Sequence, residues 1–256
     1  MKKLVSMLKV DFRRAFTSRL LFIMVGICFV MPILILVMTT MMDGSVTTDQ
    51  FGNETVIEGF KNVWQIIGSV SGDASAMSMD ITSMCNINML YFVIAVFVGL
   101  FVSEDFRSGY AKNIFTVRAK KTDYVIAKTV LLTVSGMLMI LAFVVGSMIG
   151  GAVSGLPFDL VGVSALEVAM CILAKLLLVL VFVPIFLIVS VAAKHRAWLS
   201  IVGSLCVGML MFTMVPIISP LNTGVLNLIM CLAGGALFSV GLGAVSKLIL
   251  DKTSIL

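Results

Sequence analysis

Charged side chains are scarce in this sequence. Asp, Glu, Lys and Arg make up only 12% of its 256 residues, whereas 60% of the residues are hydrophobic. A soluble domain carries about twice that share of charged residues. So little polar material could not cover the surface of a water-soluble fold. The composition therefore excludes a soluble protein and indicates a chain whose solvent is the lipid bilayer.

Residue types that support chemistry are also missing. The chain has one His, and none of its five Cys residues forms a C-x-x-C pair, so no zinc or redox motif is indicated. It has no G-x-x-x-x-G-K-[ST] loop to hold a nucleotide. No Asp, Glu or His lies in the middle of a long apolar segment, where a proton- or sodium-driven transporter usually needs one. We therefore expect no catalytic residue, metal site or cofactor in this chain, and any active transport must be powered by another protein.

Long apolar segments, in contrast, are abundant. A helix needs about 20 apolar residues to cross the hydrocarbon layer, and six segments meet this requirement. They are residues 20–42, 85–103, 124–150, 166–193, 198–218 and 225–245. The sequence thus predicts an all-α integral membrane protein with six transmembrane helices, which form a single transmembrane domain over residues 1–256.

The placement of Lys and Arg predicts the orientation of these spans. With the N-terminus inside, sixteen of the 18 basic residues lie in inner segments, while Lys61 lies outside and Lys175 within a span. Inner loops of membrane proteins carry such an excess of Lys and Arg. We therefore expect both termini in the cytoplasm, a large extracellular loop at 43–84 and a first inner loop at 104–123. This asymmetry also explains the net charge of +5 without a nucleic-acid partner.

Residues 1–19 are predicted to form an amphipathic interfacial helix. Apolar residues recur at spacings of three and four, and charged residues take the other side. An apolar stripe backed by basic residues suits the surface of an anionic inner leaflet. The alternative is a positive flank that only sets the topology. The predicted stripe is Leu4, Val5, Leu8, Phe12, Ala15 and Phe16, and the predicted polar side is Lys2, Lys3, Lys9, Asp11, Arg13 and Arg14.

A periodic pattern in the outer loop predicts a short helix at the outer surface. Apolar residues between positions 56 and 67 trace one helical face, which would hold Trp64 at headgroup level. The loop also carries Met77, Met79 and Met84, whose thioethers could bind Cu(I). Because the whole chain holds 19 Met, such a group is expected by chance, and we predict no copper site. The residues of the helical face are Val56, Ile57, Phe60, Val63, Trp64 and Ile67.

Lys175 is the only charged residue well within a predicted span. Charges inside the membrane are costly and often functional, so Lys175 could line a substrate path. Alternatively, its side chain could reach the outer headgroups as an outer-leaflet anchor. Glu167 lies eight residues earlier, close to the same helical face, and could pair with it.

Proline and glycine mark special positions in other spans. Pro216 and Pro220 bracket the outer end of the fifth segment and predict a broken or re-entrant turn there. Gly146 and Gly150 form a G-x-x-x-G pattern, which predicts close packing against another helix.

The first inner loop contains apolar residues where a mere connector would have none. Ile114, Phe115 and Val117 lie in a segment that should face water. A docking element would bury such residues in a partner's groove. The alternative is a basic loop that lies on the lipid surface.

Residues 104–113 resemble a short motif of the permease subunits of bacterial type-2 ABC exporters. The motif is an acidic residue, followed by Gly with Thr or Tyr, directly after the second span. The layout of an amphipathic N-terminal helix and six spans is similar to that family over nearly the whole chain. The resemblance implies that the 104–123 loop is a coupling element, with Lys194, His195 and Arg196 as a minor second contact. The coupling residues that it implies are Glu104, Asp105, Arg107, Gly109 and Tyr110, next to the apolar Ile114 and Phe115.

The resemblance also implies partners and a location. Two permeases, identical or paralogous, would assemble with two cytoplasmic ATPase subunits in the bacterial plasma membrane. ATP and Mg²⁺ would be bound by the ATPases and not by this chain. The expected function is export of a peptide, antibiotic or lipid. Two alternatives remain open, a sensor or immunity protein that binds a peptide at its outer loop, and a channel.

Overall fold

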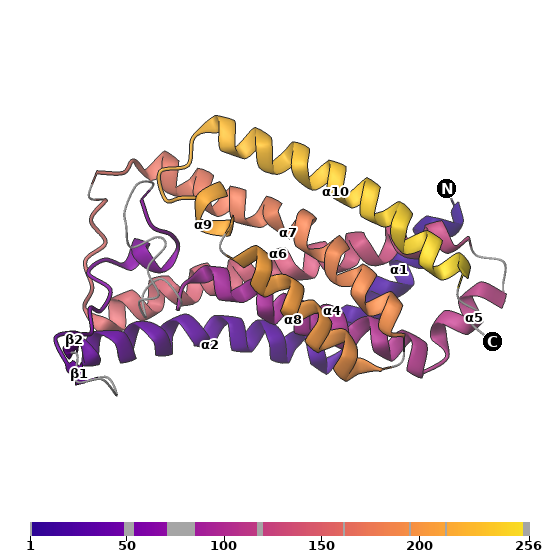
Figure 1. Cartoon of the computed structure of the whole chain (residues 1–256), viewed down its shortest axis with the longest axis horizontal. Helices are drawn as coiled ribbons and strands as arrows, with labels where there is room; N and C mark the ends of the chain where they lie inside the picture. Colours follow the sequence, from indigo (N-terminus) through magenta and orange to yellow (C-terminus); the bar gives the residue numbers. More distant parts are fainter. Residues whose placement is uncertain are drawn as a thin grey trace.

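The helical class is confirmed by a computed structural model of the chain (Figure 1). It describes residues 2–48, 54–70, 85–116, 120–160, 162–194, 196–212 and 214–252, with the backbone alone for residues 2, 3, 47, 48, 54 and 55. The predictions made for Met77, Met79, Met84, Val117 and His195 lie outside the described residues.

Nine α-helices form the described body of the chain. They are α1 (Lys2–Thr17), α2 (Arg19–Met42), α4 (Leu90–Arg107), α5 (Tyr110–Thr116), α6 (Lys121–Ser154), α7 (Ala165–Ala193), α8 (Ala197–Phe212), α9 (Met214–Ile218) and α10 (Val225–Lys252). The loop between α2 and α4 adds a hairpin of β1 (Val46–Thr48) and β2 (Glu54–Val56), and the 3₁₀ helices η1 (Val63–Ile66) and η3 (Ile87–Met89).

Five of the described helical segments are long and apolar enough to cross a membrane. They correspond to five of the six predicted spans. The remaining one, the fifth predicted span over residues 198–218, is described as the 16-residue α8 and the five-residue α9, and residue 213 between them lies outside the described residues. α9 stops before Pro220, as the restriction on the residue before a proline requires. The described helix thus ends at Ile218, close to Pro220.

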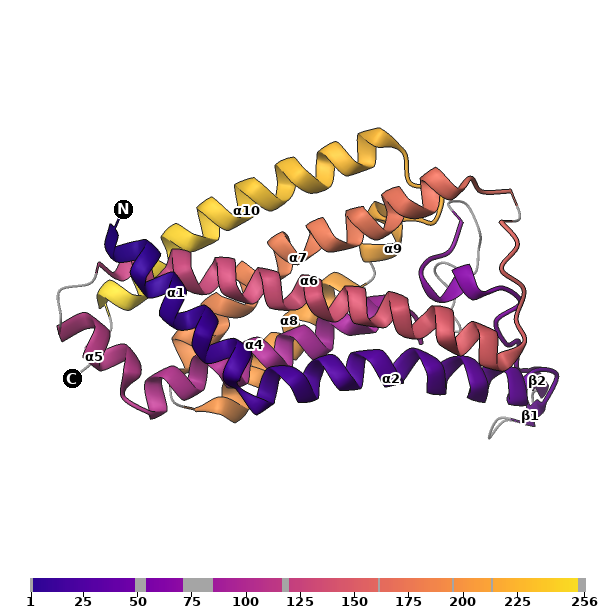
Figure 2. The same ribbon diagram turned by 180° about the vertical axis from the view of Figure 1, so that it is seen from behind.

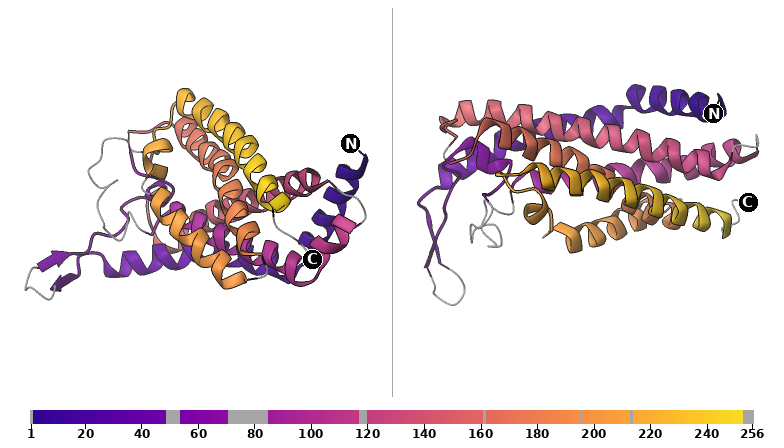
Figure 3. Two further views of the ribbon diagram at one scale, coloured as in Figure 1. Left: turned by 45° about the vertical axis from the view of Figure 1, so that its right-hand side comes forward. Right: turned by 90° about the horizontal axis from the view of Figure 1, so that it is seen from above.

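The elements divide between two ends of an elongated bundle (Figures 1 and 2). We call the end that carries α1, α5 and the last turns of α10 the α1 end. We call the other end, where β1, β2 and η1 lie, the hairpin end. Figure 3 shows the hairpin projecting beyond the helices and α10 running along the outside of α7.

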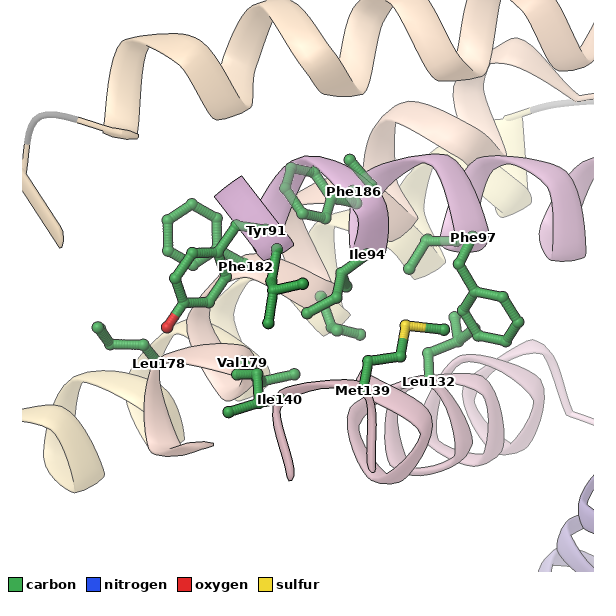
Figure 4. Close-up of a cluster of buried hydrophobic side chains, with 14 of the residues drawn as sticks. Tyr91, Ile94, Phe97, Leu132, Met139, Ile140, Leu178, Val179, Phe182 and Phe186 are labelled. Carbon is green, nitrogen blue, oxygen red and sulfur yellow. The ribbon is translucent and has the colours of Figure 1, made fainter. Parts of the chain in front are cut away.

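The bundle core is formed where α4, α6 and α7 meet (Figure 4). The rings of Tyr91 and Phe182 stack with centroids 4.3 Å apart. Gly136 allows α6 to approach α7, since a Cβ there would lie 2.8 Å from Val179 Cγ1. Further side chains of this cluster are Ile94, Phe97, Leu132, Met139, Ile140, Leu178 and Phe186.

The G-x-x-x-G pattern of α6 packs against α2, as predicted. A Cβ at Gly146 would overlap the carbonyl oxygen of Phe29, and one at Gly150 would lie 2.8 Å from Ile33 Cα. Glycine at both positions lets the two backbones approach closely.

The helix predicted over residues 56–67 is wrong for most of its length. Val56 belongs to β2 and pairs with Val46 in an antiparallel hairpin. Only Val63–Ile66 is helical, as the 3₁₀ turn η1. Side chains hold this segment in place, because Asp43 accepts a hydrogen bond from the backbone N–H of Gly59 at 2.8 Å and Asn62 caps η1. Such local bonds compete with helix formation.

Candidate functional site: a buried ion cluster at the α1 end

The N-terminal helix α1 is anchored to the protein through a face that combines Asp11 of the predicted polar side with Ala15 of the predicted apolar stripe. Ser18 ends α1 and caps α2 by accepting a hydrogen bond from the backbone N–H of Leu20 at 3.2 Å. Asp11 and Ala15, which lie one turn apart, are both fully buried. The sequence placed Asp11 opposite the apolar stripe, and this is wrong, whereas Val5 of that stripe is 61% exposed. The physical reason is a buried cation on α6 that the helix covers.

Lys128 of α6 is that cation. Its Nζ lies 2.9 Å from Asp11 Oδ1 and 2.7 Å from Asp105 Oδ2, and all three side chains are fully buried. Arg14 completes the set, with Nη1 2.5 Å from Asp105 Oδ1. Three helices, α1, α4 and α6, therefore meet at a cluster of two carboxylates and two cations.

Aromatic rings close the cluster. The Tyr110 hydroxyl donates to Asp11 Oδ1 at 2.8 Å, and the Tyr124 hydroxyl donates to Asp105 Oδ2 at 3.1 Å. Lys128 Nζ lies 4.8 Å from the ring centroid of Phe101 and 5.2 Å from that of Tyr110. These distances suit cation–π attraction, which strengthens when the cation is desolvated.

Tyr110 remains a hydrogen-bond donor at any physiological pH. Burial raises the pKa of its hydroxyl, and the hydrogen bond to Asp11 raises it further. Tyr110 begins α5, so its bond to Asp11 adds a fourth helix to the cluster.

The predicted coupling residues divide into an inner and an outer set. Asp105, in the last turn of α4, is fully buried in the ion cluster, whereas its neighbours Glu104 and Arg107 are exposed. Gly109 joins α4 to α5 with a φ of 74°, a left-handed conformation that favours glycine. The exposed pair is thus open to a partner, whereas Asp105 is not.

The apolar residues of α5 do not all face outward. The Phe115 ring packs edge-on against Tyr124 with centroids 5.4 Å apart, and Ile114 is half-buried. The Phe115 ring therefore packs partly against its own chain, and docking through Ile114 and Phe115 stays a prediction. The outward residues of α5 are Lys112, Asn113 and Thr116.

Lys128 was counted in the sequence only as one more basic residue of the inner side. Its partner Asp11 is 117 positions away, so no local spacing reveals the pair. The available signal was weak. Lys128 lies one helical turn after Tyr124, within a segment that is otherwise mostly apolar.

Lys175 lies in the hairpin half of the bundle and is also fully buried. Its Nζ donates to Asn88 Oδ1 at 3.0 Å and to Ser219 Oγ at 3.1 Å. The predicted outer-leaflet anchor is therefore wrong, because the ammonium does not reach the surface. The predicted pairing with Glu167 is also wrong, because Glu167 forms a capping box with Ser164 at the start of α7.

Comparison with known proteins assigns the class. A family model described as an ABC-2 family transporter protein matches residues 8–211. The chain belongs to this family, and it is therefore a multi-pass membrane permease component of an ABC transporter, a class that associates with an ABC ATPase. No curated protein and no solved structure matches the chain. The match includes α1 from Leu8 onward, α4, α5 and α6, so the ion cluster lies within the matched region.

Proposed function

We propose that this chain is the permease subunit of an exporter in the bacterial plasma membrane, and that an ATPase subunit docks at its α1 end. The substrate would be a peptide, antibiotic or lipid. The observation that carries this proposal is the arrangement at the end of α4. There the exposed Glu104 and Arg107 flank Asp105, which is ion-paired inside the protein.

The charges of the described residues support the orientation. The α1 end is rich in basic side chains, and the hairpin end carries mainly acidic ones. A cytoplasmic α1 end agrees with the excess of Lys and Arg on inner segments. The basic set at the α1 end includes Lys9, Arg13, Arg14, Arg107, Lys112, Lys121, Lys247 and Lys252, and the acidic set at the hairpin end includes Asp43, Glu58, Asp159 and Glu167.

The ion cluster provides a route for mechanical coupling. A partner that displaces the end of α4 also displaces Asp105. This carboxylate is bonded to Lys128 of α6 and Arg14 of α1, so both helices must follow or break buried ion pairs. Breaking a buried pair is costly, so concerted movement is favoured. A push on the exposed turn would thus be transmitted to α6, which runs the length of the bundle (Figure 2).

The working assembly would contain two permeases, identical or paralogous, and two ATPases that bind ATP and Mg²⁺. The outward faces of α2 and α10 are strongly apolar. Leu237 and Val240 of α10 are 74% and 75% exposed, and Met38 of α2 is 60% exposed. Lipid or the second permease would cover these faces.

Charge reversal at the exposed pair tests this docking. We expect Glu104→Lys with Arg107→Glu to reduce the amount of ATPase that co-purifies with the chain about ten-fold, which corresponds to about 1.4 kcal/mol. The measurement is quantitative pull-down of the co-expressed ATPase, followed by ATP hydrolysis in nanodiscs.

The hairpin end offers a matched control. Glu58 and Lys61 form an exposed ion pair with a 3.5 Å N–O distance, so Glu58→Lys with Lys61→Glu makes the same charge exchange at the opposite end. This control should leave the ATPase bound. If only the control variant lost the ATPase, the ATPase would dock at the hairpin end, and the proposal would be contradicted. Peptide binding without any ATPase would favour the sensor, and ion currents from the purified chain alone would favour the channel.

A further inference from the structure

Two lysines of the described part of the chain are fully buried, and they have opposite surroundings. Lys128 contacts two carboxylates. Lys175 is held by an amide oxygen, a hydroxyl and a carbonyl, from Asn88 and Ser219, at 3.0 to 3.3 Å. Among the described residues, no ion pair includes Lys175. Within that part of the chain, the hydrogen bonds of its ammonium all go to neutral groups.

A buried ammonium without a carboxylate partner attracts any anion that can reach it. Removing an ammonium from water is costly, and neutral acceptors offset this cost less well than a negative charge does. Ionisable residues inside a membrane protein commonly mark the path of a ligand or ion for this reason. The arrangement of Lys175 therefore indicates a site for an anionic group.

A pocket of about 270 Å³ lies at the hairpin end. Trp64, Val70 and Leu221 are among its lining residues, and Lys61 lies at the same pocket. Leu221 is 5% exposed and donates its backbone N–H to the Ser69 carbonyl oxygen at 2.8 Å. Ser219, which bonds Lys175, is only two residues before Leu221. The segment 219–221 is thus the wall between the pocket and the ammonium.

This wall is an irregular segment, in which the Ser219 hydroxyl also donates to the Val215 carbonyl oxygen and the Ser219 carbonyl oxygen also accepts from the Cys171 thiol. It follows the end of the five-residue helix α9, and Pro220 in its centre has no N–H to donate. Part of its attachment is Lys175 itself, which donates to both the hydroxyl and the carbonyl of Ser219. An anion that replaces Ser219 as the acceptor for Lys175 would also release this part of the attachment.

We propose that Lys175 binds an anionic head group, a phosphate or a carboxylate, which enters from the pocket at the hairpin end. This inference rests on the proposed function only in treating the bound molecule as cargo. Displacement of the 219–221 segment would admit the anion to Lys175, past Lys61 and Asp159, the two charged residues that line the pocket.

The chain carries its own reporter for the test. It has two Trp residues, and Trp198 lies on α8, 66% exposed. Trp198→Phe leaves Trp64, which lines the pocket, as the only tryptophan of the sequence. In this background, the purified chain in a neutral detergent is titrated with dioctanoyl phosphatidylglycerol, dioctanoyl phosphatidylcholine and sodium phosphate.

We expect the anionic lipid to change Trp64 emission saturably, and the zwitterionic lipid of equal chain length to cause no saturable change. Lys175→Met should weaken binding of the anionic lipid at least ten-fold. Competition by sodium phosphate would identify the free anion as sufficient, whereas its failure to compete would show that the acyl chains are also needed. Either result supports the site if the Lys175 dependence holds.

Two further variants keep the test decisive if Lys175→Met does not fold. Asn88→Asp places a carboxylate where the amide oxygen now lies 3.0 Å from the Nζ of Lys175. The new negative charge should neutralise the site and weaken binding of the anionic lipid at least ten-fold. Lys61→Met should have a smaller effect. The inference is overturned if Lys61→Met abolishes binding while Asn88→Asp and Lys175→Met leave it unchanged. No ATPase is present in this assay, so such a failure would leave the permease assignment intact.

Discussion

Lys128 is the residue on which the buried ion cluster depends. It contacts both carboxylates of the cluster, whereas Arg14 contacts only Asp105. With Lys128 removed, Asp105 keeps a cation, but Asp11 retains only the hydrogen bond from Tyr110. An uncompensated buried carboxylate would then oppose folding.

Replacement of Lys128 by Met should therefore destabilise the protein by about 3–5 kcal/mol, the usual cost of removing one partner of a buried ion pair. The measurement is the apparent melting temperature of the purified chain in detergent. Lys128→Met combined with Asp11→Asn removes one cation and one anion, and it should recover more than half of the loss. A double variant that is less stable than the single one would contradict the pairing.

The residues of this cluster were only partly predictable. Asp105 and Tyr110 could be singled out because they lie in a short local motif after the second span. Asp11 and Lys128 could not, because the sequence does not say which polar residue of an amphipathic helix faces a distant partner. Asp11 was assigned to the solvent side on periodicity alone, and the buried ammonium of Lys128 reversed that placement.

At the scale of single elements, the apolar helices follow directly from composition. The predicted segments 20–42 and 166–193 correspond to Arg19–Met42 and Ala165–Ala193 within one residue at each end. Hydrophobic length decides this outcome, because a chain in lipid must satisfy its backbone hydrogen bonds within each segment. Local sequence is therefore sufficient for these elements.

The outer loop shows where that argument stops. Its conformation is set by bonds between distant segments rather than by periodicity. Trp64 Nε1 donates to the Phe158 carbonyl oxygen at 2.9 Å, and the Asn62 side-chain amide donates to the carbonyl of Asp159. No local pattern between residues 56 and 67 contains this information, so the predicted helix there was wrong.

The contact between α2 and α6 gives a prediction for a pair of helices. Gly146→Ala should lower the apparent melting temperature, because the added Cβ overlaps the Phe29 carbonyl oxygen and forces the helices apart. We expect a loss of about 1–3 kcal/mol, as is usual for overpacking.

A matched control lies on α2 itself. Gly26 has no heavy atom within 4 Å of an added Cβ, so Gly26→Ala should be neutral or stabilising by up to about 1 kcal/mol through helix propensity. Equal effects of the two substitutions would show that α2 and α6 do not pack as described.

For the whole molecule, the two ends of the bundle differ in how their buried charge is balanced. At the α1 end, four helices share a cluster in which carboxylates and cations are equal in number. In the hairpin half, Lys175 is held by neutral acceptors. A balanced cluster can transmit movement without exposing a charge, and an unbalanced cation can receive an anion. This difference suits a permease that is driven at one end and binds its ligand toward the other.

The central claim is that a cytoplasmic ATPase contacts the exposed turn at the end of α4, and site-specific photo-crosslinking tests it most directly. A photoreactive amino acid is placed at Arg107 in one variant and at Lys61 in another, since both side chains are exposed and lie at opposite ends. The chain is co-expressed with its ATPase and irradiated in native membranes. We expect a crosslink to the ATPase from position 107 and none from position 61, whereas a crosslink from position 61 alone would contradict the account.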